Sequence, residues 1–254
     1  MRMSIAMIGV ASMLVAAPLA GADDARAPAA PQATTENPIW TPDAATIAQV
    51  RDIVAKTQGA DGVFVVQDDG KIRHVQSGLI CRAKYPNVSF WHAFVYPSNA
   101  GQGTDVGCDY GRNDSDGKAV SKLSIFATRA AEGMTLDQAF ARYRNEVVQV
   151  TPNAISHGEA IVAEDKNPAK PSTFPEFRSE EFGLVLDGRP YTSQLLVLIL
   201  DGWVIEIRST FEGEANNIVV TKEGGVAAAV LAGGDRMMLP HALLDAIETV
   251  GKQP

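Results

Sequence analysis

Long apolar runs, basic clusters and cysteines are all scarce in this 254-residue chain. Beyond the N-terminus, the longest run of large apolar side chains is six residues (195–200), the length of a buried strand. A membrane-spanning helix needs about 20. Acidic residues outnumber basic ones by 30 to 22, for a net charge of −8, and Arg142 and Arg144 are the densest basic pair. We therefore expect no nucleic-acid partner and no binding to anionic membranes, because both require a basic patch.

Catalytic and metal-binding motifs are also missing from the sequence. No H-x-x-x-H, H-E-x-x-H or G-x-S-x-G occurs. Residues 113–117 resemble the centre of a calcium loop, but the first and last ligand positions would be Arg112 and Leu123, where acidic residues are required. We therefore expect no cofactor and no metal site. The four histidines lie far apart in the sequence: His74, His92, His157 and His241.

The N-terminus carries the pattern of a secretory signal peptide. Arg2 precedes an apolar run over residues 5–17, and Ala20-Gly21-Ala22 supplies the small residues of a cleavage site. Residues 1–22 are predicted to be removed, which changes the net charge from −8 to −9 because only Arg2 is charged. Residues 23–38 are rich in Ala and Pro and are expected to form a disordered leader. The remainder, 39–254, is expected to be one domain of a periplasmic or secreted protein, with no stable membrane insertion after cleavage.

The two cysteines, Cys81 and Cys108, are expected to form a disulfide, since an exported protein meets an oxidising compartment. One predicted strand, residues 89–96, lies between them. In a simple meander the two cysteines would be two strands apart, about 9.6 Å, whereas a disulfide needs Cα atoms within about 7 Å. The bond therefore requires either a break in the meander order or a meeting at a strand end.

Four helices are predicted from apolar periodicity and capping residues. The first begins with Thr41 as N-cap and Pro42 at its first position, and ends at Gly59. The second has a capping box formed by Thr135 and Gln138. The third covers residues 240–250, and the Ala-rich residues 226–231 form a short fourth helix.

The segments between these helices have the character of strands joined by tight turns. Asp-Gly, which tolerates the positive φ of hairpin turns, occurs five times. One such pair separates residues 191–200 from residues 203–211, where apolar and polar side chains partly alternate. Residues 195–200 are apolar on both faces and should form a central strand. The fold class is α+β: a mostly antiparallel sheet built from hairpins, with helices packed on one face.

The long apolar hairpin over residues 195–211, followed by a C-terminal amphipathic helix, resembles the Mog1/PsbP-like α/β sandwich proteins. The resemblance covers residues 181–250. It implies a secreted or regulatory binding protein more often than an enzyme, and it transfers no functional residue.

Two segments and three side chains are candidates for function. Residues 89–96 hold four aromatics and His92; alternation would place Phe90, His92, Phe94 and Tyr96 on one face, either as core or as a ligand-facing wall. Residues 167–182 combine proline and phenylalanine, which fits a lid, a partner-docking loop or a long connector pinned to the sheet by its phenylalanines. The sequence favours a non-catalytic accessory that binds a small ligand or an envelope protein. The alternative is a hydrolase with an unrecognised site, for which the first candidates are His92, Glu206 and Arg208.

Overall fold

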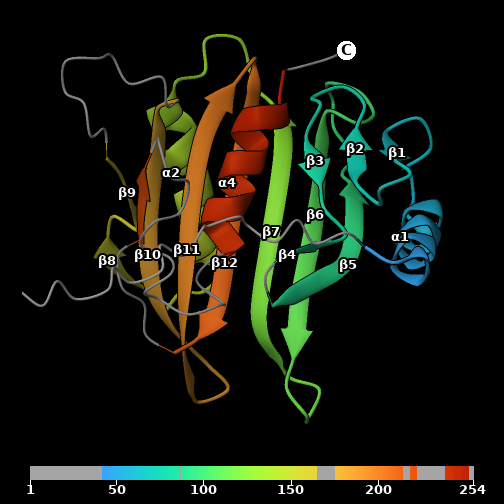
Figure 1. Ribbon diagram of the computed structural model, residues 1–254. Helices are drawn as coiled ribbons and strands as arrows, with labels where there is room; N and C mark the ends of the chain where they lie inside the picture. Colours follow the sequence, from blue (N-terminus) through green and yellow to red (C-terminus); the bar gives the residue numbers. More distant parts are fainter. Residues whose placement is uncertain (1–41, 86, 165–174, 214–217, 222–237, 252–254) are drawn as a thin grey trace, which may run out of the picture. The chain divides into compact units, whose positions relative to one another are not determined.

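The computed structural model describes residues 42–85, 87–164, 175–213, 218–221 and 238–251. The predicted signal peptide, the leader and the helix expected at residues 226–231 lie outside these ranges. An eight-stranded sheet in the order β4-β5-β6-β7-β12-β11-β10-β8 dominates the described part (Figure 1). Its strands are β4 (Lys84–Tyr85), β5 (Val88–Val95), β6 (Asp105–Asn113), β7 (Ala119–Arg129), β8 (Ile155–Gly158), β10 (Phe177–Leu186), β11 (Arg189–Leu200) and β12 (Trp203–Glu212).

The described residues also form two small sheets and three helices. A three-stranded sheet has the order β1-β2-β3, and β9 pairs with β13 in the one parallel pair among the described strands. These strands are β1 (Phe64–Val66), β2 (Ile72–His74), β3 (Ile80–Cys81), β9 (Ile161–Glu164) and β13 (Ile218–Thr221). The helices are α1 (Ala44–Lys56), α2 (Leu136–Val150) and α4 (Met238–Thr249). The expectation of a mostly antiparallel α+β fold is confirmed, with more strand than anticipated.

The hairpins follow the Asp-Gly turns. Asp187 and Gly188 join β10 to β11, Asp201 and Gly202 join β11 to β12, and all four residues have positive φ. Such turns match the twist of the strands that they connect. The expected central strand is confirmed, because β11 lies between β10 and β12 and is buried on both faces over most of its length.

The helices do not share one face of the large sheet, as the sequence had suggested. Alternate residues of β12 divide between two cores: Ile205 and Ile207 contact the core that includes Leu243 and Ala246 of α4, whereas Val204 belongs to the core formed with α2. Figure 1 shows α2 and α4 on opposite sides of the sheet. We call these sides the α4 face and the α2 face. The prediction failed because β11 is apolar on both faces, and so needs a cover on each.

The helix boundaries agree with the sequence in two cases and differ in one. The capping box of α2 is present: the Thr135 hydroxyl accepts from the Gln138 N–H at 3.3 Å, and the Gln138 side chain accepts from the Thr135 N–H at 3.0 Å. Helix α4 lies within two residues of the predicted range. Helix α1 begins later than expected, because Asp43 is its N-cap and accepts from the Thr46 N–H at 2.7 Å.

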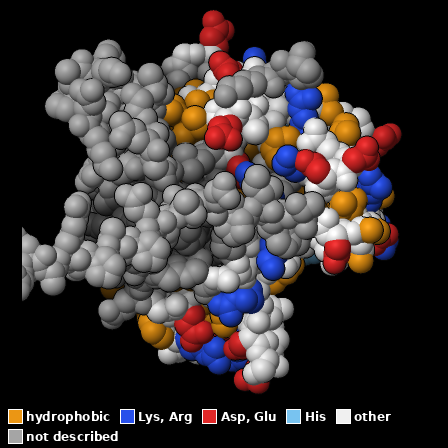
Figure 2. All heavy atoms as spheres, in the orientation of Figure 1, with side chains coloured by type: hydrophobic (Ala, Val, Ile, Leu, Met, Phe, Trp, Pro, Cys, Tyr) orange, Lys and Arg blue, Asp and Glu red, His pale blue; other side chains and the backbone are white. Residues whose placement is uncertain are grey.

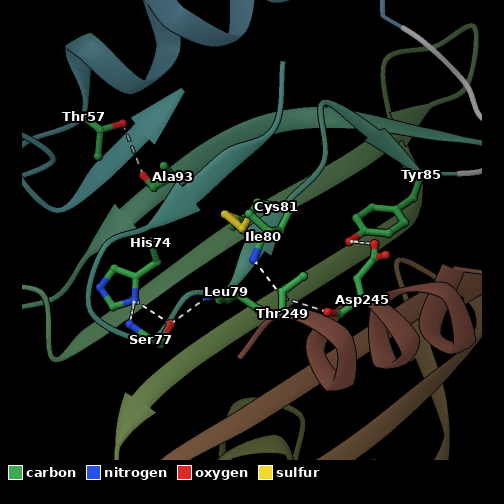
Figure 3. Close-up of a disulfide and its surroundings, with 11 residues drawn as sticks. Thr57, His74, Ser77, Leu79, Ile80, Cys81, Tyr85, Ala93, Asp245 and Thr249 are labelled. Carbon is green, nitrogen blue, oxygen red and sulfur yellow. Dashed lines mark hydrogen bonds between the residues drawn. A yellow bond between two sulfur atoms is a disulfide. The ribbon is translucent and has the colours of Figure 1, made fainter. Parts of the chain in front are cut away.

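The disulfide between Cys81 and Cys108 is present, with the two Cα atoms 6.4 Å apart. Cys81 belongs to β3 of the small sheet and Cys108 to β6 of the large one. The meander order therefore breaks between them, as the bond required. Both cysteines are buried, on the α4 face. The bond fastens the small sheet to the large one (Figure 3).

Polar contacts hold α4 against the same region. The Asp245 carboxylate accepts two hydrogen bonds from the Arg82 guanidinium, at 2.6 and 2.5 Å, and one from the Tyr85 hydroxyl at 2.8 Å. One turn later, the Thr249 hydroxyl donates to the Asp245 carbonyl and accepts from the Ile80 N–H (Figure 3). Because these hydrogen bonds form only when Asp245 and Thr249 face Arg82, Tyr85 and Ile80, they fix the position of α4 on the sheet.

Candidate functional site

The α2 face is covered unevenly. Helix α2 packs through Phe140, Tyr143 and Val147 on side chains of β10, β11 and β12. Helix α2 reaches β7 through Tyr143, which forms a side-chain hydrogen bond with Thr128, whereas α1 and the three-stranded sheet pack against the core of the opposite face. The side chains that the β5–β7 half presents are polar or aromatic instead of aliphatic. This half of the α2 face is therefore the candidate site.

A β-bulge in β5 decides which aromatic side chains reach this face. Pairing with β6 shifts register between Phe90 and His92, so Trp91 is the extra residue. Phe90 consequently lies in the core of the α4 face, where its ring contacts Tyr110 at 5.7 Å. The prediction that Phe90 shares a face with His92, Phe94 and Tyr96 is wrong, because strict alternation ignores the bulge.

Three rings form what we call the aromatic row, namely Phe94, Tyr96 and Phe126. Phe94 and Tyr96 stack with centroids 5.7 Å apart and an angle of 18° between their planes, and Tyr96 and Phe126 are 6.2 Å apart. All three are partly exposed; 38% of the Tyr96 surface remains accessible. His92 extends the row, with its ring 6.0 Å from that of Phe94.

Glycines of β6 make room for two of the large rings. A Cβ atom on Gly107 would lie 2.4 Å from the Phe126 ring, and one on Gly111 would lie 2.1 Å from the Trp91 ring. Each ring therefore lies directly against a glycine, in space that a Cβ atom would fill. Asp109 projects from the same face of β6 between these two positions, so it is flanked by aromatic rings and is only 6% exposed.

Asp109 begins a line of polar side chains across neighbouring strands, which we call the polar strip. Cross-strand pairing places Asp109 opposite Ser124 of β7, and Ser124 opposite Arg208 of β12. Asp109 Oδ2 is paired with Lys122 Nζ at 2.9 Å, and Arg208 Nη2 donates to Glu206 at 2.5 Å. Two atoms of the strip, Asp109 Oδ1 and Arg208 Nε, are buried without a hydrogen-bond partner among the described residues. Four other side-chain atoms of those residues share this property, namely His74 Nε2, Tyr110 Oη, Gln194 Oε1 and Ser209 Oγ. Buried polar atoms without partners are rare and call for an explanation.

Glu206 is the most perturbed carboxyl group of this surface. It is 3% exposed, and burial raises its pKa to about 7 against the opposing effect of the Arg208 guanidinium. Glu146 of α2 raises the same pKa and Arg142 lowers it, so the border of α2 lies within electrostatic range of the strip.

A hollow of about 480 Å³ lies beside this surface, at the outer edge of β5. It is open to solvent, and the last turn of α1 forms its other wall. The Thr57 hydroxyl donates to the Ala93 carbonyl at 3.4 Å, so the helix end partly satisfies the strand edge (Figure 3). The lining residues are Ile53, Lys56, Thr57, Gln58, Trp91, His92, Ala93, Phe94 and Val95.

The structure places the three residues selected from the sequence on one face but does not join them all. Glu206 and Arg208 are in contact. His92 pairs across strands with Asp109 and lies three strands from Arg208, about 14 Å away at the usual strand spacing. No hydrogen bond links His92 to a carboxylate among the described residues. Reasoning from sequence missed Asp109, Lys122 and Phe126; the alternation of Gly107, Asp109 and Gly111 is the signal that could have indicated them.

One serine–histidine pair has the geometry of an activated nucleophile but lacks access. His74 Nδ1 lies 2.7 Å from Ser77 Oγ and also accepts from the Ser77 N–H at 3.2 Å, which assigns the ring proton to Nε2. Both residues are 0% exposed, and the His74 ring lies between Phe64 and Trp203. Burial lowers the pKa of His74 to about 4. A pair enclosed in this way is part of the core (Figure 3).

The described residues also form a second open hollow, of about 490 Å³, where α2 meets β8 and β10. No group of three or more potential metal ligands occurs among the residues that the structure describes. None of the helices in the described ranges is long and apolar enough to cross a membrane. On the face shown in Figure 2, acidic and basic side chains are interspersed where the chain is described, without a continuous basic patch.

Comparison with known proteins leaves the family open. No family model and no curated protein matches the chain. Among solved structures, the chain is similar to PA94, a protein of unknown function from Pseudomonas aeruginosa, at 12% identity and a TM-score of 0.31. That match covers 65% of this chain and 99% of the other.

Proposed function

We propose that this chain is an exported, non-catalytic protein that binds a ligand on the β5–β7 half of the α2 face. The observation that carries the proposal is the pair of buried, unpartnered atoms in the polar strip, Asp109 Oδ1 and Arg208 Nε, beside a partly exposed aromatic row. Binding sites commonly combine aromatic surface with a few placed polar groups. A bound molecule would supply the missing hydrogen bonds.

Export is supported by the disulfide as well as by the N-terminal sequence. Disulfides persist in oxidising compartments and are uncommon in the cytosol. Cys81 and Cys108 pair in a buried position that links two sheets, which is typical of a structural bond. Residues 181–250 resemble the Mog1/PsbP-like proteins in their pattern of elements, and membership of that group, which we also propose, would fit a binding protein.

The contacts on this surface favour binding over hydrolysis. Nucleophilic catalysis needs a nucleophile within hydrogen-bond reach of its base. Ser124, the hydroxyl of the polar strip, lies two strands from His92, with Asp109 between them. Glu206 is engaged by Arg208. These side chains can hold a ligand, and none of them is paired as nucleophile and base.

Native mass spectrometry of the full-length protein, purified from its own cell envelope, tests the proposal. We expect the wild type to carry a bound mass, Arg208→Gln to lose it, and Arg51→Gln to retain it. Arg51 is a matched control because it also forms one ion pair with an acidic residue, at an exposed position on α1. A bound mass that survives Arg208→Gln, or a wild type that carries no bound mass, would contradict the proposal.

A further inference from the structure

We propose that the ligand of the polar strip and the aromatic row is a neutral saccharide. This inference rests on the proposed function and names its ligand class. Three properties of the site support it: the pairing of its charged side chains, the kind of hydrogen bonds that are missing, and the shape of the aromatic row.

The charged side chains of the strip are already paired within the protein. Lys122 Nζ lies 2.9 Å from Asp109, and Arg208 Nη2 lies 2.5 Å from Glu206, which its pKa of about 7 leaves partly ionised at neutral pH. An anionic ligand would have to compete with Glu206 for the guanidinium, and a cationic one would have to compete with Lys122 for the carboxylate. Desolvating an ion without a free counter-charge is costly. The site therefore favours a ligand without formal charge.

The strip lacks one hydrogen-bond donor and one hydrogen-bond acceptor. Asp109 Oδ1 needs a donor and Arg208 Nε needs an acceptor. Ser124 lies between them, 6% exposed, and its hydroxyl can act in either role. Sugar hydroxyl groups both donate and accept, so a saccharide can supply both kinds of partner. The backbones of β6 and β12 are two strand spacings apart, about 9.6 Å, and side chains reach into that span from both sides.

The aromatic row supplies the apolar part of such a site. Phe94 and Tyr96 stack nearly parallel, and Phe126 lies against Gly107 beside them, with its ring tilted by 49° to that of Tyr96. The C–H face of a sugar ring can pack on rings that are held in this way, at little cost in side-chain ordering. The rings are partly exposed, so each has apolar surface left to bury.

Titration of full-length protein with maltotriose, cellotriose and N-acetylchitotriose, followed by two-dimensional NMR, tests the inference. We expect saturable shifts at the aromatic row for at least one sugar. Arg208→Lys keeps the positive charge but removes Nε, and should weaken binding at least about tenfold, which corresponds to ~1.4 kcal/mol. Arg51→Lys is its control. Phe94→Ala should weaken binding by a similar factor, whereas Val65→Ala, an exposed residue of β1, should not.

Folding of each variant is checked by its melting temperature and its disulfide content. Raising the salt concentration from about 50 to 500 mM should change the affinity for a neutral sugar less than about twofold, because screening acts on charged pairs. Co-sedimentation with insoluble chitin and cellulose distinguishes a polysaccharide from a free oligosaccharide as the source of the sugar.

The outcomes separate this inference from the proposed function. If no sugar binds up to about 10 mM, which would occupy most of a site with a Kd of about 1 mM, or if Arg208→Lys and Phe94→Ala bind as the wild type does, the saccharide inference is wrong. Glutarate and lysine are titrated in parallel. If either shifts the same resonances and no sugar does, the surface binds a charged ligand and only the saccharide inference fails. If nothing binds and no mass co-purifies, both proposals fail.

Discussion

Two buried titratable side chains, His74 and Glu206, should shape the pH dependence of stability in opposite directions. His74 is 0% exposed and Glu206 is 3% exposed. Burial lowers the pKa of His74 from 6.5 to about 4 and raises the pKa of Glu206 from 4.5 to about 7. The two pKa shifts therefore cover nearly the same pH range.

The sign follows from which state binds the proton first. For His74 the unfolded state is protonated first, so its contribution is lost as the pH falls from about 6.5 to 4, by about 3 kcal/mol in total. For Glu206 the folded state is protonated first, so stability is gained as the pH falls from about 7 to 4.5, again by about 3 kcal/mol. Between pH 4.5 and 6.5 these two contributions should nearly cancel in the wild type.

Urea denaturation at several pH values across this range measures the prediction. Glu206→Gln should expose the His74 contribution, so that stability falls by about 3 kcal/mol on acidification. His74→Gln should show the reverse slope, and the double variant should lose both contributions. The prediction concerns the slope of the unfolding free energy against pH. Its value at any single pH is not used, because either substitution can also change stability for other reasons. If Glu206→Gln shows the same pH profile as the wild type, the burial argument for Glu206 is refuted.

Three further outcomes are expected. Replacing Cys81 and Cys108 by serine should lower the free energy of unfolding by about 3–4 kcal/mol, measured by denaturant titration, because the bond closes a loop with a sequence separation of 27 residues. Gly107→Ala should displace the Phe126 ring and weaken ligand binding with the fold retained, as judged by titration and circular dichroism; unchanged binding would count against the aromatic row. Asp245→Ala should cost about 3 kcal/mol in thermal or urea unfolding, since it leaves a guanidinium and a buried hydroxyl without their acceptor; a loss below about 1 kcal/mol would mean that α4 is held by its apolar contacts alone.

Local signals in the sequence were sufficient for the hairpins and the caps. The Asp-Gly pairs at 187–188 and 201–202 predicted turns because few other dipeptides tolerate positive φ at both residues. The Thr135–Gln138 capping box predicted the start of α2 because both of its hydrogen bonds are local. Such features depend on residues a few positions apart, and sequence displays them directly.

Features that depend on the tertiary arrangement could not be predicted. The placement of α2 and α4 on opposite faces depends on which side of β11 each helix reaches, and the apolar pattern of β11 is the same for both sides. The bulge at Trp91 is visible only in the pairing of β5 with β6. Asp109 and Arg208 belong to the same polar strip because β7 lies between their strands, although they are 99 residues apart in the sequence.

The disulfide has a consequence for the durability of the candidate site. Cys81 and Cys108 bracket β4 and β5, so His92, Phe94 and Tyr96 all lie inside one covalently closed ring of chain, and Asp109 follows directly after it. A protease that cuts the connection between β5 and β6 would leave two fragments that are still joined through sulfur. The strand that carries His92 and Phe94 would therefore stay covalently attached to the rest of the chain after such a cut, as long as no reductant opens the disulfide.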